Sequence, residues 1–550
     1  MNNFLQYILL GIAGISSFYF LFPPENWIGA SVCLAFAIII FLLDRRSKII
    51  VRIAGISWKH EDFVRGWLIT GRTGCGKTQA AINRITYQVF KNVKNWGGIC
   101  LDQKGLYWEI LVKMSEHFGR RNDLVLLQTR PLNAPADWKP SCSINITGDP
   151  NVPSSTYAKV ICDTAQSLTG KSQSPFFPAR AQLAIQAAFD VLRFLGYPAT
   201  IPNVYGILRT PTQTDKVRDE FNLVFSGRKP EEEEEASDFQ KKARAILEAF
   251  ESHFNQPADQ RGGVDGTIDT FLGFFLDPEV ADVFCADKPT FSIGEMDKGK
   301  IVCIALAQKY QTERLYINTI LKLSYYFHAF SRFDKPEKNR KDDNLLILFA
   351  DEGQEILTGA ESAFADHRAA GIIREAKCTI VLATQAYSSI LAALDERYAK
   401  VFMLNMSNEI ILTVADYQSA EIAEHNIGEH KIVKRSWSWG QSRSFNYSDA
   451  VEAFYQRWQL RKLPKFTAIV RHCEKGHRKC FIAPINPDGS YPTWFLNSHP
   501  HYWIIGGMQH LGRWIGKFFQ SKESLESTQT SKATTASDAS SNNSLNRKPL

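Results

Sequence analysis

The sequence lacks closely spaced cysteine pairs. Its ten cysteines are scattered over 550 residues, which argues against a disulfide-bonded scaffold and indicates a reducing compartment for the main body. Cys100, Cys303 and Cys378 lie inside apolar runs that are typical of buried strands. A buried, reduced thiol is the ordinary explanation for a cysteine in such a run.

Zinc-binding patterns are scarce as well. Metal-like spacing occurs in a single group, which comprises His472, Cys473, His477 and Cys480. Structural zinc sites commonly take two ligands from each of two separate knuckles, and this group lacks that arrangement. Apolar runs at 466–470 and 480–482 flank a polar turn at 474–476. A β-hairpin is therefore the favoured interpretation, and a zinc site is the alternative.

Neither sign of charge dominates the chain. Lysine and arginine number 64 against 57 acidic residues, which gives a formal charge of +7, and 44% of the residues are hydrophobic. This small positive excess fits a nucleic-acid or membrane partner without requiring either. The length is sufficient for two or three domains with a large buried core.

Two apolar runs at the start of the chain predict a transmembrane hairpin within residues 1–50. They cover residues 4–22 and 27–43, and each approaches the roughly 20 residues that a helix needs to cross the hydrocarbon core. The first run lacks a basic start and the second follows it directly, which disfavours a cleaved signal peptide. Basic residues at 45–48 follow the second run, so the positive-inside rule places both termini and the main body in the cytoplasm.

The most informative stretch is a glycine-rich loop between an apolar strand and a helix. It comprises Gly71, Arg72, Thr73, Gly74, Cys75, Gly76, Lys77 and Thr78. Residues 67–70 predict the strand before it, and residues 78–85 have the spacing of a helix. In such a loop the backbone N–H groups bind phosphates, Lys77 reaches the β and γ phosphates of ATP, and the Thr78 hydroxyl ligates Mg²⁺. The sequence therefore predicts a nucleoside triphosphate site.

Further apolar runs predict a parallel α/β sheet that resumes after a long interruption. These runs are residues 97–102, 124–128, 300–306, 344–350 and 379–383. Strands that alternate with helices favour a parallel sheet covered by helices on both faces. The residues between the runs at 124–128 and 300–306 are rich in helical patterns. We expect a nucleotide-binding domain in two parts, 51–153 and 287–485, with an inserted all-α domain at 154–286.

Two of the predicted strands end in residues suited to nucleotide hydrolysis. Asp351 and Glu352 follow one strand, and Gln385 follows another. The carboxyl ends of parallel strands meet at one edge of the sheet, where ligands of such sheets collect. Asp351 can hold Mg²⁺ together with Thr78. Glu352 can orient and deprotonate the attacking water, and Gln385 can contact the γ phosphate.

The last part of the chain contains segments of mixed character. Residues 436–448 combine aromatic, polar and basic residues and predict either a mobile loop or an ordinary surface hairpin. In the first case single-stranded nucleic acid would contact the loop by charge and stacking, through Arg435, Arg443, Trp437 and Trp439. Residues 486–520 contain a candidate amphipathic segment, and residues 521–550 have the composition of a disordered tail.

The order of these parts resembles the type IV coupling proteins, the membrane-anchored RecA-like ATPases of conjugation and type IV secretion within the FtsK/HerA superfamily. The resemblance rests on four stretches: residues 71–78, residues 101–105, residues 350–352, and Arg374 with the Gln385 that follows it. It implies a RecA-like P-loop domain with a helical insertion, and a ring hexamer whose channel passes DNA. It also implies that Arg374 reaches the nucleotide of the neighbouring subunit.

We therefore expect a translocase, dependent on ATP and Mg²⁺, in the bacterial inner membrane. It would couple DNA, single-stranded and carrying a relaxase, to the components of a type IV secretion channel. Its catalytic residues would be Lys77, Glu352, Gln385 and Arg374. The alternative is an ATP-dependent receptor that recruits protein substrates to a secretion machine.

Overall fold

The computed structural model describes most of the chain after its first 48 residues. The described residues are 49–135, 137–169, 174–226, 233–359, 365–439 and 443–503. The predicted transmembrane hairpin, the tail at 521–550 and the part of the amphipathic segment after residue 503 lie outside these residues. Among the residues that are described, none of the helices is long and apolar enough to cross a membrane.

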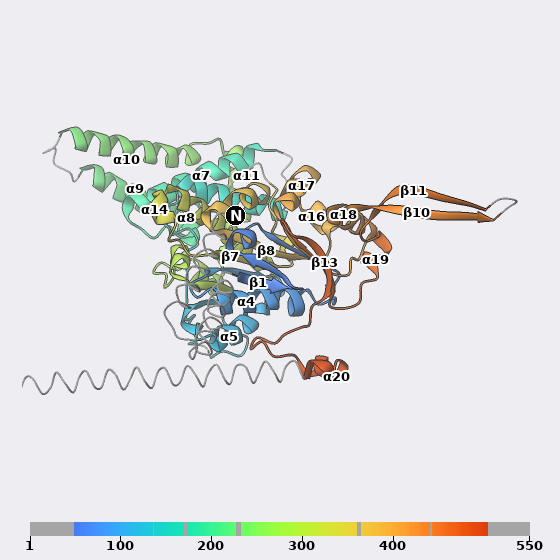
Figure 1. Cartoon of the computed structure of the whole chain (residues 1–550). Coiled ribbons are helices and arrows are strands. Elements are labelled where there is room, and N and C mark those ends of the chain that lie inside the picture. The colour runs from blue at the N-terminus through green and yellow to red at the C-terminus, as the bar shows by residue number, and fades with distance from the viewer. Residues whose placement is uncertain are drawn as a thin grey trace, which may run out of the picture.

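A nine-stranded sheet forms the centre of the molecule (Figure 1). Its strands are, in spatial order, β13 Gly476–Phe481, β12 Thr467–His472, β9 Asn408–Ile411, β3 Trp67–Thr70, β8 Cys378–Thr384, β7 Leu346–Asp351, β4 Gly97–Asp102, β6 Ile301–Ala305 and β5 Leu124–Gln128. Neighbours from β9 to β5 are parallel, whereas β12 is antiparallel to both β9 and β13. The predicted parallel α/β sheet is confirmed, with an antiparallel edge. The six predicted strands differ from the observed ones by no more than two residues at either end.

Helices cover both faces of the sheet because its central strands are apolar on both sides. In β3, Leu68 belongs to one hydrophobic core, and Trp67 and Ile69 belong to the other. The second core is completed by α4 Asn83–Asn92 and α5 Tyr107–His117. The first is completed by α13 Gln311–Ser331, α15 Asp366–Ile372, α16 Tyr387–Ala393, α17 Glu396–Asn405 and α18 Tyr417–Ile427.

Residues between β5 and β6 form a group of helices. These are α6 Ser154–Thr169, α7 Phe176–Leu195, α8 Ile201–Arg209, α9 Pro211–Ser226, α10 Glu233–Phe254, α11 Ala258–Leu272 and α12 Pro278–Phe284. The chain enters and leaves this group side by side, because Ile144 N donates to Val283 O at 2.7 Å and Phe291 N donates to Ser143 O at 3.1 Å. These backbone bonds return the chain to the sheet close to where it left.

Shorter elements complete the described part. They are β1 Ile49–Ile53, β2 Ile56–Lys59, α3 His60–Phe63, α14 Glu337–Arg340, α19 Arg457–Arg461, α20 Thr493–Ser498 and the 3₁₀ turns Arg121–Asp123, Gly273–Phe275, Ile293–Lys298, Arg332–Asp334, Gly353–Ile356 and Ile373–Ala376. The β1–β2 hairpin packs against the start of β9, where Trp58 Nε1 donates to Asn408 Oδ1 at 2.7 Å.

Two hairpins settle alternatives that the sequence left open. Strands β12 and β13 pair around a turn at residues 473–475, which confirms the hairpin interpretation of the cysteine and histidine group. The segment at 436–448 belongs to a second hairpin of β10 Glu429–Trp439 and β11 Arg443–Ala453, paired regularly along its length. This hairpin projects away from the body (Figure 1). The sequence did not predict its length.

Candidate active site

The glycine-rich loop connects β3 to the next helix in a tightly packed setting. A Cβ atom on Gly76 would lie 2.4 Å from the Phe466 ring, and one on Gly71 would lie 2.7 Å from the Cys75 sulfur. Gly76 also has a φ of 108°, which side chains disfavour. The loop is tied to the segment after β9, because Arg72 N donates to Thr413 O at 2.8 Å. Packing therefore requires glycine at both positions.

The Lys77 side chain contacts the first residue of this loop. It is buried, and Nζ donates to the Gly71 carbonyl at 2.7 Å. An ammonium group has three donors, and Gly71 is its only hydrogen-bond acceptor within the described part of the chain. The remaining donors are available to phosphate oxygens. The helical turn that follows, Lys77–Ile82, is a π-helix, a detail that the helical spacing of the sequence did not distinguish.

Thr78 and Asp351 contact each other at the carboxyl ends of the parallel strands. The Thr78 hydroxyl donates to Asp351 Oδ2 at 2.9 Å, although the two residues are 273 positions apart. Burial raises the pKa of Asp351, the Thr78 hydrogen bond opposes this effect, and the charge of Asp102 raises it further. A cation here would stabilise the ionised carboxylate. A hydroxyl and a carboxylate are also the oxygen ligands that Mg²⁺ prefers, so these residues fit the ion.

Glu352 lies at the centre of a polar network beside this pair. Its carboxylate accepts hydrogen bonds from Lys104 Nζ, Gln354 Nε2 and Gln385 Nε2, each at 3.0 Å. Burial raises the pKa of Glu352, but the hydrogen bonds from Gln354, Lys104 and Gln385 outweigh it, and the net pKa is below its ordinary value. The carboxylate is therefore ionised near neutral pH and can accept a proton from water.

The backbone of Glu352 is strained. Its φ of 52° is in the left-handed region, which is uncommon for a residue with a side chain. Such a conformation costs about 1–3 kcal/mol and is often found at functional sites. Glu352 directly follows the last residue of β7, the metal-binding candidate Asp351. The strain is consistent with a requirement to hold this carboxylate in one orientation.

Lys104 also belongs to the site, although the sequence indicated it only as part of the family-like stretch at 101–105. It follows β4, whose Asp102 is the register partner of Asp351 on β7. Asp102 accepts hydrogen bonds from the backbone of Lys104 and Leu106, at 2.9 and 2.7 Å, and so shapes the loop. A signal was present: a polar loop follows a buried strand at the same sheet edge as the other site residues.

A polar cavity opens beside Glu352. It has a volume of about 550 Å³ and is lined by Gln103, Lys104, Gln308, Arg314, Gln354 and Gln385, among other residues. Its lining is rich in amide side chains, which can hold ordered water. The cavity gives water access to the Glu352 carboxylate.

Arg374 does not join these residues. It lies in the turn Ile373–Ala376, before β8, whereas Gln385 follows β8. Seven residues of strand separate these ends, which corresponds to about 23 Å at the usual rise per residue. Arg374 is exposed, and its side chain has no hydrogen bond or ion pair to any residue that the structure describes. Arg374 therefore lies at the amino ends of the parallel strands, whereas the phosphate loop of its own chain lies at their carboxyl ends.

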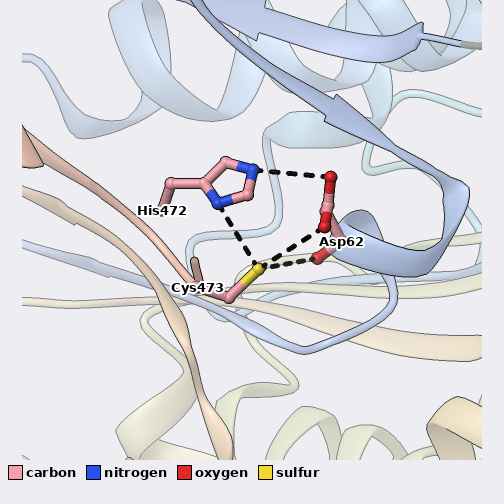
Figure 2. A group of neighbouring side chains, drawn as sticks. All are labelled: Asp62, His472 and Cys473. Carbon is pink, nitrogen blue, oxygen red and sulfur yellow. Dashed lines mark hydrogen bonds and ion pairs between the residues drawn. The ribbon is translucent and has the colours of Figure 1, made fainter. Parts of the chain in front are cut away.

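A second cluster has ligand-type residues, but its chemistry does not suit a metal. Figure 2 shows Asp62, His472 and Cys473, whose side-chain ligand atoms lie within 4.8 Å of one another. His477 and Cys480 of the predicted zinc alternative do not belong to it. The backbone N–H groups of Glu474 and Lys475 donate to His472 Nδ1 at 2.9 and 3.2 Å. Since Nδ1 accepts these bonds, the neutral ring carries its proton on Nε2, which cannot then bind a metal.

The charges around this cluster lead to the same conclusion. Burial and the charge of Asp62 raise the pKa of the Cys473 thiol to about 11, so the thiolate that a metal needs is scarce. The Lys475 ammonium lies 3.6 Å from Asp62 Oδ2 and already compensates its charge. His472 also stacks on Trp58, with ring centroids 5.0 Å apart. The cluster thus joins α3 to β12.

Comparison with known proteins identifies the family. Residues 54–471 match the family described as Type IV secretory system Conjugative DNA transfer. The chain belongs to this family. The resemblance to type IV coupling proteins that its motifs indicated is therefore confirmed, and the phosphate loop, Asp351, Glu352, Arg374 and Gln385 all lie within the matched span.

Solved structures show the same fold in another conjugative coupling protein. The unbound form of TrwBdeltaN70 has 16% sequence identity and a TM-score of 0.54, and the match covers 81% of this chain and 90% of that one. TrwB in complex with the ATP analogue ADPNP has 15% identity and a TM-score of 0.53, with coverages of 78% and 88%. TrwB in complex with ADP and Mg²⁺ has 14% identity and a TM-score of 0.51, with coverages of 80% and 91%. No curated protein matches the chain by sequence.

Proposed function

We propose that this conjugative DNA transfer protein is an ATP-driven translocase that couples DNA, with its relaxase, to a type IV secretion channel. The observation that carries the proposal is the contact of the Thr78 hydroxyl with Asp351 at 2.9 Å. It joins the phosphate loop to the strand that carries the second half of a hydrolysis site. The structures of TrwB with ADP and Mg²⁺ and with an ATP analogue support ATP and Mg²⁺ as the ligands.

The site residues divide the work of hydrolysis. Backbone N–H groups of residues 71–78 bind the phosphates, and Lys77 exchanges its contact with the Gly71 carbonyl for phosphate oxygens. Thr78 and Asp351 hold Mg²⁺, which when bound neutralises charge on the β and γ phosphates. Glu352 accepts a proton from the attacking water, and Gln385 orients the Glu352 carboxylate near the γ phosphate.

Arg374 acts on the nucleotide of a neighbouring chain in a ring hexamer. Its exposure and its distance from its own phosphate loop leave it available for a contact outside its own chain. An arginine that reaches a neighbour's γ phosphate stabilises the charge of the transition state. This arrangement makes hydrolysis dependent on assembly.

The proposal extends to the organisation of the chain and its location. The apolar runs at 4–22 and 27–43 anchor the protein in the bacterial inner membrane, with the main body in the cytoplasm. Residues 51–153 and 287–485 form the nucleotide-binding domain, and residues 154–286 form an inserted all-α domain. The channel components of the secretion system are the partners on the membrane side.

The stimulation of ATP hydrolysis tests this function. We expect single-stranded DNA to raise the ATPase rate of the full chain several-fold, because translocation couples substrate binding to turnover. A control with protein substrates of the same secretion system separates the alternative. Stimulation by those proteins and not by DNA would identify a protein-recruiting receptor and overturn the proposal.

A further inference from the structure

The β10–β11 hairpin is unusually long. Each strand has eleven residues, which corresponds to a length of about 37 Å. The hairpin extends away from the body in Figure 1. At its base, Phe454 N donates to Gly428 O at 3.1 Å, and the rings of His430 and Phe454 stack at 4.7 Å. An isolated two-stranded ribbon is marginally stable in water, so its length favours a partner.

The two faces of the hairpin differ in chemistry. Successive residues of a strand alternate between faces, so the register fixes which positions share one. One face contains the pairs Lys431 with Val451, Val433 with Asp449, Arg435 with Tyr447, Trp437 with Phe445, and Trp439 with Arg443. The other contains the pairs Lys434 with Ser448, Ser436 with Asn446, and Ser438 with Ser444. We call the first the aromatic face and the second the serine face.

The aromatic face has the charge expected of a surface that binds a polyanion. From Arg435 to Tyr447 the sequence has two arginines and no acidic residue. Acidic residues occur nearer the base. Asp449 lies on the aromatic face opposite Val433, and Lys434 of the serine face pairs with Glu452 at 2.8 Å. Arg435 has no such acidic partner among the described residues. Its guanidinium lies over the Tyr447 ring, 5.7 Å from the centroid.

Aromatic residues recur on this face at a spacing that suits nucleic-acid bases. Positions on one face of a strand lie about 6.8 Å apart, which is twice the separation of about 3.4 Å between stacked bases. One step along the face therefore spans two base separations. Tyr447 is 66% exposed, so its ring is accessible. Unpaired bases stack on aromatic side chains irrespective of sequence, whereas paired bases in a duplex are not accessible in this way.

We propose that the aromatic face of the β10–β11 hairpin binds single-stranded DNA, with the rings stacking on bases and the arginines contacting phosphates. The inference rests on the proposed DNA-translocating function and assigns it a contact site outside the nucleotide site. The hairpin base lies near α18. DNA held there would be close to the ATPase body without occupying the phosphate loop.

Binding of a labelled oligo(dT) to the full-length protein tests this site. Tyr447→Ala should weaken affinity about tenfold, because one base loses the ring on which it stacks. Arg435→Gln should weaken affinity about fivefold and reduce the slope of log affinity against log salt by about 0.7. Lys434→Gln is the matched control, since it removes the same charge from the serine face one position away. It should change affinity less than twofold, and equal losses for the two charge variants would overturn the proposal.

Two further measurements separate the causes of a negative result. Basal ATPase activity should be the same in all three variants, because the substituted side chains are exposed and distant from Glu352 in sequence and fold. Ultraviolet cross-linking to a bromodeoxyuridine oligonucleotide should label a peptide within residues 429–453. Labels confined to other peptides would overturn the hairpin site while leaving DNA translocation intact.

Two other outcomes are informative. If the variants bind DNA normally but fail to assemble, the aromatic face is a contact between copies of the chain and the proposal is wrong. If the unmodified protein does not bind single-stranded DNA at all, both the hairpin site and the proposed translocase function fail.

Discussion

The Lys104 ammonium and the Glu352 carboxylate form an ion pair at 3.0 Å, although 248 residues separate them in the sequence. The pair spans the ends of β4 and β7, which are neighbours in the sheet. Glu352 is buried and Lys104 is half exposed, so one partner of the pair is reachable from the polar cavity. Lys104 thereby stabilises the ionised form of the residue proposed to activate water.

This relationship predicts a pH effect. Lys104→Gln removes a hydrogen bond and a positive charge that hold the pKa of Glu352 down, so that pKa should rise. The acid limb of the ATPase profile should then move to higher pH, with a larger loss of kcat at pH 6 than at pH 8. Lys104→Arg retains the charge and should preserve the profile. An unchanged profile for Lys104→Gln would show that Glu352 is not the titrating base.

The Thr78–Asp351 contact predicts a specific loss of metal dependence. Asp351→Asn should lower kcat about 100-fold or more, because charge neutralisation by Mg²⁺ is worth several kcal/mol. It should also abolish the strengthening of nucleotide binding by Mg²⁺ in titrations with and without the ion. Glu355→Gln is the control, since it removes an exposed carboxylate four residues away. A normal Mg²⁺ response in Asp351→Asn would remove this residue from the metal site.

The proposed role of Arg374 predicts that two inactive variants restore ATPase activity when they are mixed. Arg374→Ala should lower kcat about 1,000-fold with little change in nucleotide affinity, whereas Arg368→Ala, an exposed arginine on α15, should have little effect. Mixing Arg374→Ala chains with Lys77→Ala chains should restore part of the activity. In such a ring the intact loop of one chain faces the intact arginine of the other. If the mixture stays inactive although mixed rings form, the trans role is wrong.

The buried Lys322–Asp366 pair predicts a large effect on stability. Lys322 Nζ lies 2.5 Å from Asp366 Oδ2, both side chains are almost fully buried, and the Tyr326 hydroxyl donates to Asp366 Oδ1 at 2.6 Å. Lys322→Met leaves a buried carboxylate without its cation, so the free energy of unfolding should fall by about 3–5 kcal/mol. The exposed pair Lys341–Glu337 is the control. Lys341→Met should change stability by less than about 1 kcal/mol, measured by urea unfolding.

Local sequence signals predicted most of the sheet and the phosphate loop. The central strands are apolar on both faces, so their runs stand out from the helices around them. Strand β9 was missed because Asn408 and Glu409 interrupt its apolar pattern. Both are fully buried, and Glu409 is compensated by Arg471 at 2.9 Å. Compensation by a residue 62 positions away is not visible in a local window.

The sequence predicted which residues belong to the site, but it did not predict the contacts between them. The sequence placed Asp351, Glu352 and Gln385 at one sheet edge, because parallel strands share the direction in which they end. It did not reveal that Lys104 contacts Glu352 or that Glu352 has a left-handed backbone, since both depend on the spatial order of β4, β7 and β8. The Arg374 role came from family resemblance, because the position of a neighbouring chain is not encoded in local patterns.

The most direct test of the central claim is the frequency of conjugative DNA transfer with Lys77→Ala in place of the unmodified chain. We expect loss of transfer and of ATP hydrolysis, with membrane insertion and protein level unchanged, because Lys77 is the buried cation of the phosphate loop. Lys91→Ala, an exposed lysine on α4, should transfer DNA normally. Full transfer by Lys77→Ala would contradict the claim that nucleotide hydrolysis at this loop drives DNA movement.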